Sequence, residues 1–221
     1  MAKRRRTTYG YKKSYSRVSK NNTISRGYKK RAYTMTSRVA FVINSRTSKT
    51  FTIASGAQAA ADDLDVAANI VNSDMHKQLS SVFDQYRIEK VNIKYKLLSN
   101  PATVVTGQVP HINFFTCVDR SGFNANVSLA QLRTYQSYKE TSYSTTGDLG
   151  RSHFVSVGQS DLVSKSTYYD TKTKAQFPHV AQGIDVGSNV ASNLDFKFSI
   201  EIDAQVRYRG VRLDTSAVSI S

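Results

Sequence analysis

The residues best suited to chemistry lie at the N-terminus, where cationic side chains are concentrated. Residues 1–38 contain 13 Lys and Arg residues and no acid, and the first acid of the chain is Asp62. Such a segment is suited to bind a polyanion, because Lys and Arg side chains that neutralise phosphates release counterions. The candidate phosphate-binding residues are Lys3, Arg4, Arg5, Arg6, Lys12, Lys13, Arg17, Lys20, Arg26, Lys29, Lys30, Arg31 and Arg38.

Tyrosines are interleaved with these charges. Stacking of an aromatic ring on an unpaired base contributes about 1–3 kcal/mol, so this pattern suits a single strand better than a closed duplex. We therefore expect residues 1–38, the arm, to bind single-stranded nucleic acid. The base-stacking candidates are Tyr9, Tyr11, Tyr15, Tyr28 and Tyr33.

Other roles of the arm are compatible with part of this pattern. Lys3, Arg4, Arg5 and Arg6 form a candidate nuclear localisation signal, which can coexist with nucleic-acid binding. The arm could also act as a solubilising tail. A membrane-surface role is disfavoured, because the arm has no apolar face at helical spacing.

The chain divides into two parts of different physical character. The arm has too few aliphatic side chains to bury and is expected to be disordered on its own. Residues 39–221, the body, carry 18 basic and 16 acidic residues and are long enough for one domain with one core. The single cysteine, Cys117, excludes an intrachain disulfide and favours intracellular assembly. We expect neither a signal peptide nor a membrane span.

The remaining reactive residues lack the spacing of a metal or catalytic site. Asp62, Asp63 and Asp65 lack the Gly and the distal Glu of a calcium loop, so a solvated loop is favoured over a cation site. No phosphate-loop, dinucleotide, serine-hydrolase or zinc-protease motif occurs. We expect no enzyme activity, no cofactor and no metal. The four histidines, which share no zinc-ligand spacing with one another or with Cys117, are His76, His111, His153 and His179.

Alternation of apolar and polar residues predicts the strands of the body. The clearest segment is 194–209, where eight apolar residues alternate with eight polar ones. In the strand expected over 83–98 the apolar register slips by one residue between Ile88 and Val91, which indicates a bulge. Residues 109–118 are apolar on both faces and predict a buried central strand. Further strands are expected over 39–43 with 49–54 as one bent strand, over 153–158 and over 166–173.

Three polar segments, 55–80, 119–150 and 174–193, are expected to be long loops with short helices. One helix is expected to be capped by Ser73 and another, over 128–136, to open with a capping box of Ser128 and Gln131. Strands without a βαβ rhythm predict an all-β fold, an antiparallel two-sheet jelly-roll sandwich. An immunoglobulin-like sandwich is the alternative, but its Cys…Trp…Cys pattern is absent.

Charged residues of the last strand fall in its exposed phase. We expect Asp195, Glu201 and Asp203 to face solvent or a neighbouring subunit. Arg207 and Arg209 are expected to pair with acids across strands in preference to extending a phosphate-binding surface.

Together, three segments resemble the capsid proteins of circular single-stranded DNA viruses, above all circovirus-like ones. They are the basic arm, FDQYRIEKVNIKYKL at 83–97 and FKFSIEIDAQVRYRG at 196–210. The resemblance covers the arm and about 35 residues of strand, and implies a jelly roll, roughly 60 copies in an icosahedral shell, inward-pointing arms and delivery to the nucleus. The matching motif residues are Phe83, Tyr86, Arg87, Ile88, Lys90, Val91 and Ile93.

These observations lead to two hypotheses. The first is a capsid protein that assembles with itself and packages a single-stranded genome, with DNA favoured and with host nuclear import machinery as a further partner. Its locations would be the virion and the host nucleus. About 60 arms would neutralise a large share of a strand of roughly one to two thousand nucleotides. The second is a non-assembling nucleic-acid-binding protein of ribosomal or chromatin type, although such proteins rarely have a nearly neutral β body with long loops.

Overall fold

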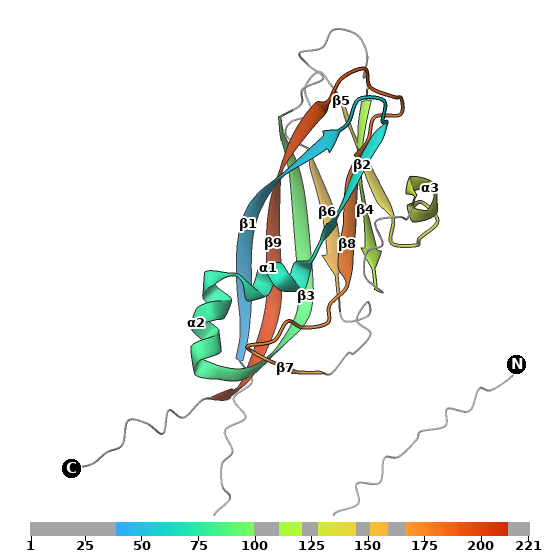
Figure 1. Ribbon diagram of the computed structural model, residues 1–221. Helices are drawn as coiled ribbons and strands as arrows, with labels where there is room; N and C mark the ends of the chain where they lie inside the picture. The colour runs from blue at the N-terminus through green and yellow to red at the C-terminus, as the bar shows by residue number, and fades with distance from the viewer. Residues whose placement is uncertain (1–38, 100–110, 121–127, 145–150, 159–166, 212–221) are drawn as a thin grey trace, which may run out of the picture. The chain divides into compact units, whose positions relative to one another are not determined.

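Two antiparallel sheets face each other across one core (Figure 1), as expected for the predicted sandwich. The computed structural model describes residues 39–99, 111–120, 128–144, 151–158 and 167–211. The first sheet contains, in spatial order, β1 (Val39–Ile53), β9 (Leu194–Val211), β3 (Phe83–Ser99) and β6 (Ser152–Val157), with the two-residue β7 (Tyr169–Asp170) also paired to β3. The second contains β2 (Ala59–Leu64), β8 (His179–Asp185), β4 (His111–Asp119) and β5 (Lys139–Ser144).

The pairing order of the eight main strands is that of a jelly roll. With β7 set aside, the first strand pairs with the last, the second with the penultimate, and so inward: β1 with β9, β2 with β8, β3 with β6 and β4 with β5. The additional pairings β3–β9 and β4–β8 join these couples into the two sheets. The all-β, antiparallel jelly-roll prediction is therefore confirmed.

The two longest strands hold the centre of the first sheet. The alternation in β9 places its even-numbered residues in the core and its odd-numbered residues on the outer side. The predicted register slip in β3 is a bulge between Ile88 and Lys90. Across the core, the ring of Phe114 on β4 lies 4.5 Å from that of Phe198 on β9 and 5.9 Å from that of Phe51 on β1. The facing sheets are thus joined by stacked and edge-on aromatic pairs.

Three short helices begin at side-chain caps. Asp65 caps α1 (Val66–Val71), and the predicted cap Ser73 accepts a hydrogen bond from the backbone N–H of His76 at the start of α2 (Asp74–Val82). The predicted capping box of Ser128 and Gln131 opens α3 (Leu129–Leu132), which is shorter than the helix expected over 128–136. None of the described helices is long and apolar enough to cross a bilayer.

Each of the three segments expected to be loops contains a strand, so those predictions were wrong in part. Residues 55–80 include β2 and α1, residues 119–150 include β5, and residues 174–193 include β8. Strand β8 is buried along almost its whole length, and β2 and β5 are polar edge strands, so none shows one apolar and one wet face. Conversely, the strand expected over 166–173 is only β7. Of the strand expected over 109–118, residues 109–110 lie outside the described residues.

Candidate functional site

The residues predicted to bind nucleic acid all lie within residues 1–38, outside the described residues, and their role stays a prediction. The structure does describe the point at which the chain enters the body. Strand β1 begins at Val39, which is paired with Tyr208 near the end of β9. The next residue of β1, Ala40, is paired with Arg207, and Arg207 is paired on its other side with Arg87 of β3. The entry point therefore adjoins cationic side chains of the two central strands.

These cations share one carboxylate. The Glu89 carboxylate accepts from Arg87 Nη2 at 2.6 Å and lies 3.0 Å from Arg207 Nε. The predicted cross-strand pairing of Arg207 with an acid is confirmed. Arg87 and Glu89 are two positions apart on β3, so both point to the outer side of the sheet, and Glu89 is the residue that the bulge leaves without a partner on β9.

The expected acid partner of Arg209 is replaced by an amide and a ring. Arg209 Nε donates to Gln85 Oε1 at 2.7 Å, and its guanidinium carbon lies 3.8 Å from the ring centroid of Tyr168. Arg87 lies 5.0 Å from the same centroid. We call Arg87, Glu89, Arg207 and Arg209 the arginine cluster. Its three guanidinium groups and one carboxylate leave two positive charges unmatched within the cluster, so it can attract anions.

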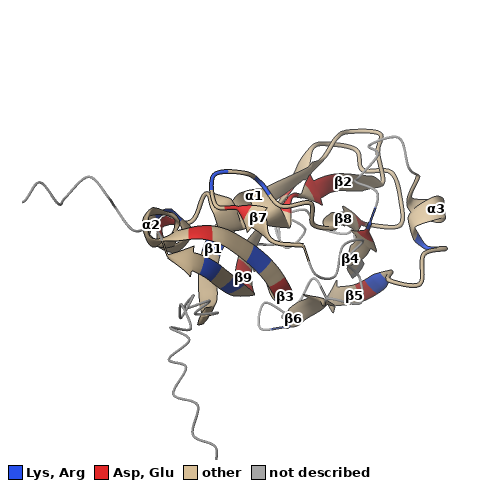
Figure 2. Ribbon diagram, turned by 90° about the horizontal axis from the view of Figure 1, so that it is seen from below, with Lys and Arg blue, Asp and Glu red and all other residues tan. Residues whose placement is uncertain are grey.

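Acids of β9 lie on the outer side of the first sheet, as expected. Glu201 bridges Arg46 on β1 at 3.0 Å and Lys94 on β3 at 3.4 Å. Asp195 accepts a hydrogen bond from the Thr52 hydroxyl at 2.6 Å, and Asp203 is exposed. Figure 2 shows basic and acidic segments on the neighbouring ribbons of β1, β9 and β3.

The aspartates of the DDLD segment have protein partners. Asp62 is ion-paired with Lys49, and Asp63 contacts His179 Nδ1 at 2.5 Å. Asp65 accepts from Lys174 at 2.6 Å and caps α1. Partial burial acts to raise the pKa of Asp65, but the hydrogen bonds from Lys174 and the cap outweigh it, and the pKa is lowered. Asp62 and Asp63 lie in strand β2, so the expected loop is wrong for these two, whereas Asp65 lies between β2 and α1. No group of three potential metal ligands occurs among the described residues.

Two other histidines are buried and hydrogen-bonded. His76 Nδ1 lies 2.7 Å from the Tyr208 hydroxyl, and His153 Nε2 lies 2.7 Å from the Thr116 hydroxyl. Burial lowers the pKa of both rings, that of His153 to about 4. Burial also raises the pKa of the Cys117 thiol, which keeps it protonated. These groups are therefore suited to structural roles.

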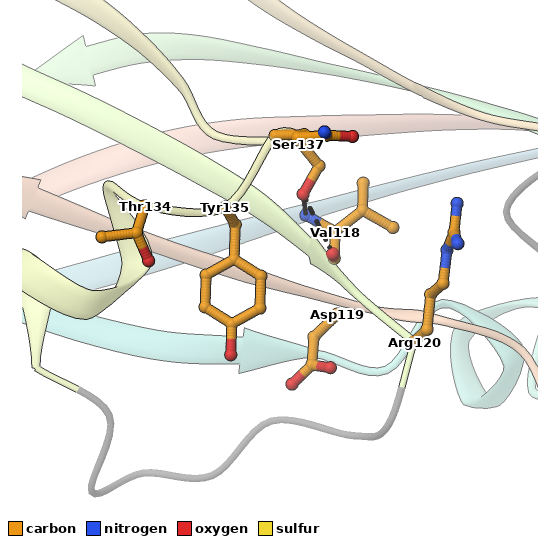
Figure 3. A pocket seen from close by; sticks show the side chains of 7 residues that line it. Val118, Asp119, Arg120, Thr134, Tyr135 and Ser137 are labelled. Carbon is orange, nitrogen blue, oxygen red and sulfur yellow. Dashed lines mark hydrogen bonds between the residues drawn. The ribbon is translucent and has the colours of Figure 1, made fainter.

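A hollow of about 460 Å³ opens between the end of β4 and the segment after α3 (Figure 3). The Ser137 hydroxyl fixes this segment by accepting from the Val118 N–H at 3.1 Å and donating to the Val118 carbonyl at 3.0 Å. Its wall combines Asp119, Arg120 and Tyr135 with small polar groups. The hydroxyls of Thr134 and Ser137 in this lining donate to backbone carbonyls, those of Gln131 at 2.7 Å and Val118 at 3.0 Å.

Two features of the outer side of the first sheet were not predicted from the sequence. One is the row of Lys90, Lys94 and Lys96 along β3, which read only as the polar phase of a strand. The other is Phe154, whose side chain is 61% exposed on β6. The sequence did contain a signal for Phe154, because this aromatic residue stands in the phase opposite to the buried His153 and Val155.

No protein-family model and no curated protein sequence matches the chain. Solved structures do match its fold. The semi-empty virus-like particle of giant freshwater prawn Macrobrachium rosenbergii nodavirus has a TM-score of 0.53 and 12% identity, over 90% of this chain and 97% of that one. The structure of Mud crab tombus-like virus has a TM-score of 0.50 and 11% identity, over 99% of this chain and 98% of that one. The structure of Cocksfoot mottle virus has a TM-score of 0.50 and 10% identity, over 95% of this chain and 99% of that one.

At such identities the similarity concerns the fold, and it extends over nearly the whole of both chains in each comparison. The strand order of the body and these three matches agree on one architecture. This chain has the jelly-roll fold found in virus particles.

Proposed function

We propose that this chain is a viral coat protein whose body assembles into a closed icosahedral shell and whose arm binds a single-stranded genome inside it. The observation that carries this proposal is the direct junction of two unlike parts. An acid-free segment with 13 cationic residues leads into β1 of a jelly roll, and the first residues of β1 lie beside the arginine cluster. The fold shared with virus particles supports the assembly of the body.

The charge distribution supports a division of labour between the two parts. With 18 basic and 16 acidic residues, the body has little net charge, so copies can approach one another without strong repulsion. A homomeric shell is closed by repeating the same contacts under point-group symmetry. The arm is too cationic to join such contacts and instead gains free energy by neutralising phosphate.

Single-stranded DNA is the favoured genome in this proposal. Its support is the resemblance of the arm and of the segments 83–97 and 196–210 to capsid proteins of circular single-stranded DNA viruses. The 13 cationic residues would contact phosphates, and the five arm tyrosines would stack on unpaired bases. Lys3, Arg4, Arg5 and Arg6 would also direct the chain to the host nucleus through the import machinery.

Electron microscopy of the purified full-length chain, followed by nuclease digestion, tests the proposal. We expect closed shells whose contents resist nucleases until the shells are opened, and then are digested by DNase and not by RNase. Digestion by RNase would replace the DNA genome with RNA and leave the coat function intact. Monomers at every salt concentration, with or without nucleic acid, would contradict the coat function and favour a non-assembling ribosomal or chromatin type of protein.

A fluorescent fusion tests the localisation signal separately. The full-length fusion is expected in the nucleus, and replacement of Lys3, Arg4, Arg5 and Arg6 by Gln is expected to leave it in the cytoplasm. Replacement of Lys12, Lys13, Arg17 and Lys20 by Gln removes the same charge elsewhere in the arm and is the matched control. Equal nuclear accumulation of all three proteins would contradict the assignment.

A further inference from the structure

Among the described residues of the body, positive charge is concentrated on the outer side of the first sheet, here called the outer face. Its outward side chains include eight basic and four acidic residues, whereas the remaining described residues include eight basic and nine acidic ones. The basic residues of the outer face are Arg46, Arg87, Lys90, Lys94, Lys96, Lys197, Arg207 and Arg209, and the acidic ones are Glu89, Asp195, Glu201 and Asp203.

The acidic residues of the outer face pair mainly with its arginines, so most of its lysines keep an unneutralised positive charge. Glu201 is shared between Arg46 and Lys94, and Glu89 serves the arginine cluster. Lys90, Lys96 and Lys197 make no ion pair with any residue that the structure describes. The unmatched cations therefore lie mainly along β3, one of the two central strands of the sheet.

The lysines of β3 form a regular row. Lys90, Asn92, Lys94 and Lys96 occupy alternate positions, so successive side chains on this face are about 7 Å apart. The row begins two strand positions from Arg87 of the arginine cluster. A flexible phosphate backbone can follow such a row, because its contacts are electrostatic and do not require a rigid duplex geometry.

An exposed aromatic ring stands beside this row. Phe154 on the edge strand β6 is paired with Lys94, and at 61% it has the largest exposed fraction among the large hydrophobic residues that the structure describes. Its strand neighbours Val155 and Val157 are buried, so the core does not use the Phe154 ring. The adjacent row is polar, with the Ser156 hydroxyl donating to Asn92 Oδ1 at 2.9 Å.

From this juxtaposition we infer that the outer face is a second binding surface for single-stranded nucleic acid. Phe154 stacks on a base, while Lys90, Lys94 and Lys96 contact the phosphates that flank it. Cationic grooves with aromatic platforms are the arrangement by which proteins bind single strands without reading their sequence. The inference rests on the proposed function for the source of the strand, and adds to it that the body also contacts the genome.

The charge of the outer face favours a nucleic acid strand over two other occupants, the arm and a second copy of the chain. The arm carries 13 positive charges and no negative one, so the outer face repels it. A second copy of the chain, docked face to face, would bring the two lysine rows together, which opposes like charges. A polyanion with exposed planar groups matches both the charge and the ring.

Oligonucleotide binding by the full-length chain tests the inference. Phe154→Ala removes the ring, Phe154→Tyr restores it, and Lys96→Gln removes one phosphate contact. The matched controls are Val42→Ala, an exposed apolar residue of β1 on the same face, and Lys77→Gln, an exposed lysine of α2. The dissociation constant is measured over a salt series for a fluorescent single-stranded oligonucleotide and for an abasic one of equal length.

We expect Phe154→Ala to weaken binding of the base-bearing strand about fivefold, with no change for the abasic strand and full recovery in Phe154→Tyr. Lys96→Gln should reduce the slope of log K against log salt by about 0.7, and neither control should change binding. An unchanged affinity of Phe154→Ala for the base-bearing oligonucleotide would overturn the inference. If that variant also failed to assemble, Phe154 would be identified as a contact between copies.

The outcomes also separate this inference from the proposed function. A chain that binds the oligonucleotide through Phe154 but never assembles would support the outer-face surface and contradict the coat function. A chain that forms shells with nucleic acid but is insensitive to Phe154→Ala would support the coat function and overturn the outer-face surface.

Discussion

His153 shows how a buried polar residue can join the two sheets. It lies on β6 of the first sheet, and its ring nitrogens contact hydroxyls of the second sheet, Thr116 of β4 at 2.7 Å and Thr141 of β5 at 2.8 Å. A neutral imidazole has one donor and one acceptor, and two hydroxyls can satisfy both. Burial, with a smaller effect of the positive charge on Lys139, lowers the pKa of His153 to about 4.

This shift predicts a loss of stability in acid. Between about pH 6.5 and pH 4 the unfolded chain binds a proton that the folded chain does not, so the free energy of unfolding falls as pH decreases through this window. Near pH 5 the loss attributable to His153 is about 2 kcal/mol. Urea unfolding of the wild type and of His153→Gln near pH 7.5 and pH 5 measures it. An equal pH dependence in both proteins would contradict the role assigned to His153.

At the scale of elements, two kinds of strand could be predicted: those with one wet face, and β4, whose sequence is apolar on both faces. Strands β9 and β3 have an exposed outer face, so their alternation and the bulge near Glu89 are visible in the sequence. Strand β8 lies between β2 and β4 and is buried on both faces, so its sequence HVAQGID has no period. Helix caps were predictable because a cap is a local interaction between residues three positions apart.

Close packing at Gly183 gives a prediction for β8. A Cβ atom at this position would lie 2.3 Å from the Ala60 carbonyl oxygen of β2 and 2.5 Å from Phe115 Cζ of β4. Gly183→Ala should therefore destabilise the body by about 3 kcal/mol, because the backbone of β2 must shift. Urea unfolding tests this against Ser48→Ala, an exposed position of β1. A midpoint equal to that of the wild type would show that β2 moves at little cost.

His76 is the one fully buried residue of helix α2, whose Met75 and Leu79 pack, partly buried, against the core. The ring contacts the Tyr208 hydroxyl at 2.7 Å and the Thr171 carbonyl oxygen at 3.1 Å. His76→Phe keeps an aromatic ring but removes both hydrogen bonds, and is expected to cost about 2 kcal/mol. Hydrogen exchange of the amides of Asp74–Val82 should become faster, with little change in β9. Unchanged protection of α2 would show that its apolar contacts suffice.

At the scale of the whole molecule, part of the candidate site could be predicted from composition and part could not. The absence of acids before Asp62 identifies the arm without any knowledge of the fold. The outer face exists only because β3 pairs with β9 and β6, which brings Lys94, Glu201 and Phe154 into one row. Pairing partners distant in the chain leave no local trace in the sequence, so the arginine cluster and the neighbours of Phe154 required the structure, although the strand phase of Phe154 itself was visible in the sequence.

The charge of the arm predicts the salt dependence of nucleic-acid binding. If all 13 cationic residues contact phosphates of a long single strand, log K should fall with log salt with a slope approaching about −9. Replacement of these residues by Gln should reduce the slope to that of the outer face alone. Titrations at several salt concentrations measure both slopes. Equal slopes for the two proteins would contradict the assignment of the arm as the main phosphate-binding segment.

The most direct test of the division of labour is sedimentation velocity with the absorbance of protein and of nucleic acid recorded together. The wild type is expected to sediment as a closed shell that carries nucleic acid. The variant with the 13 arm cations replaced by Gln is expected to form a shell of similar size with most of the nucleic acid lost. A variant shell with the full wild-type load of nucleic acid, or a wild type that sediments only as a monomer, would contradict the account.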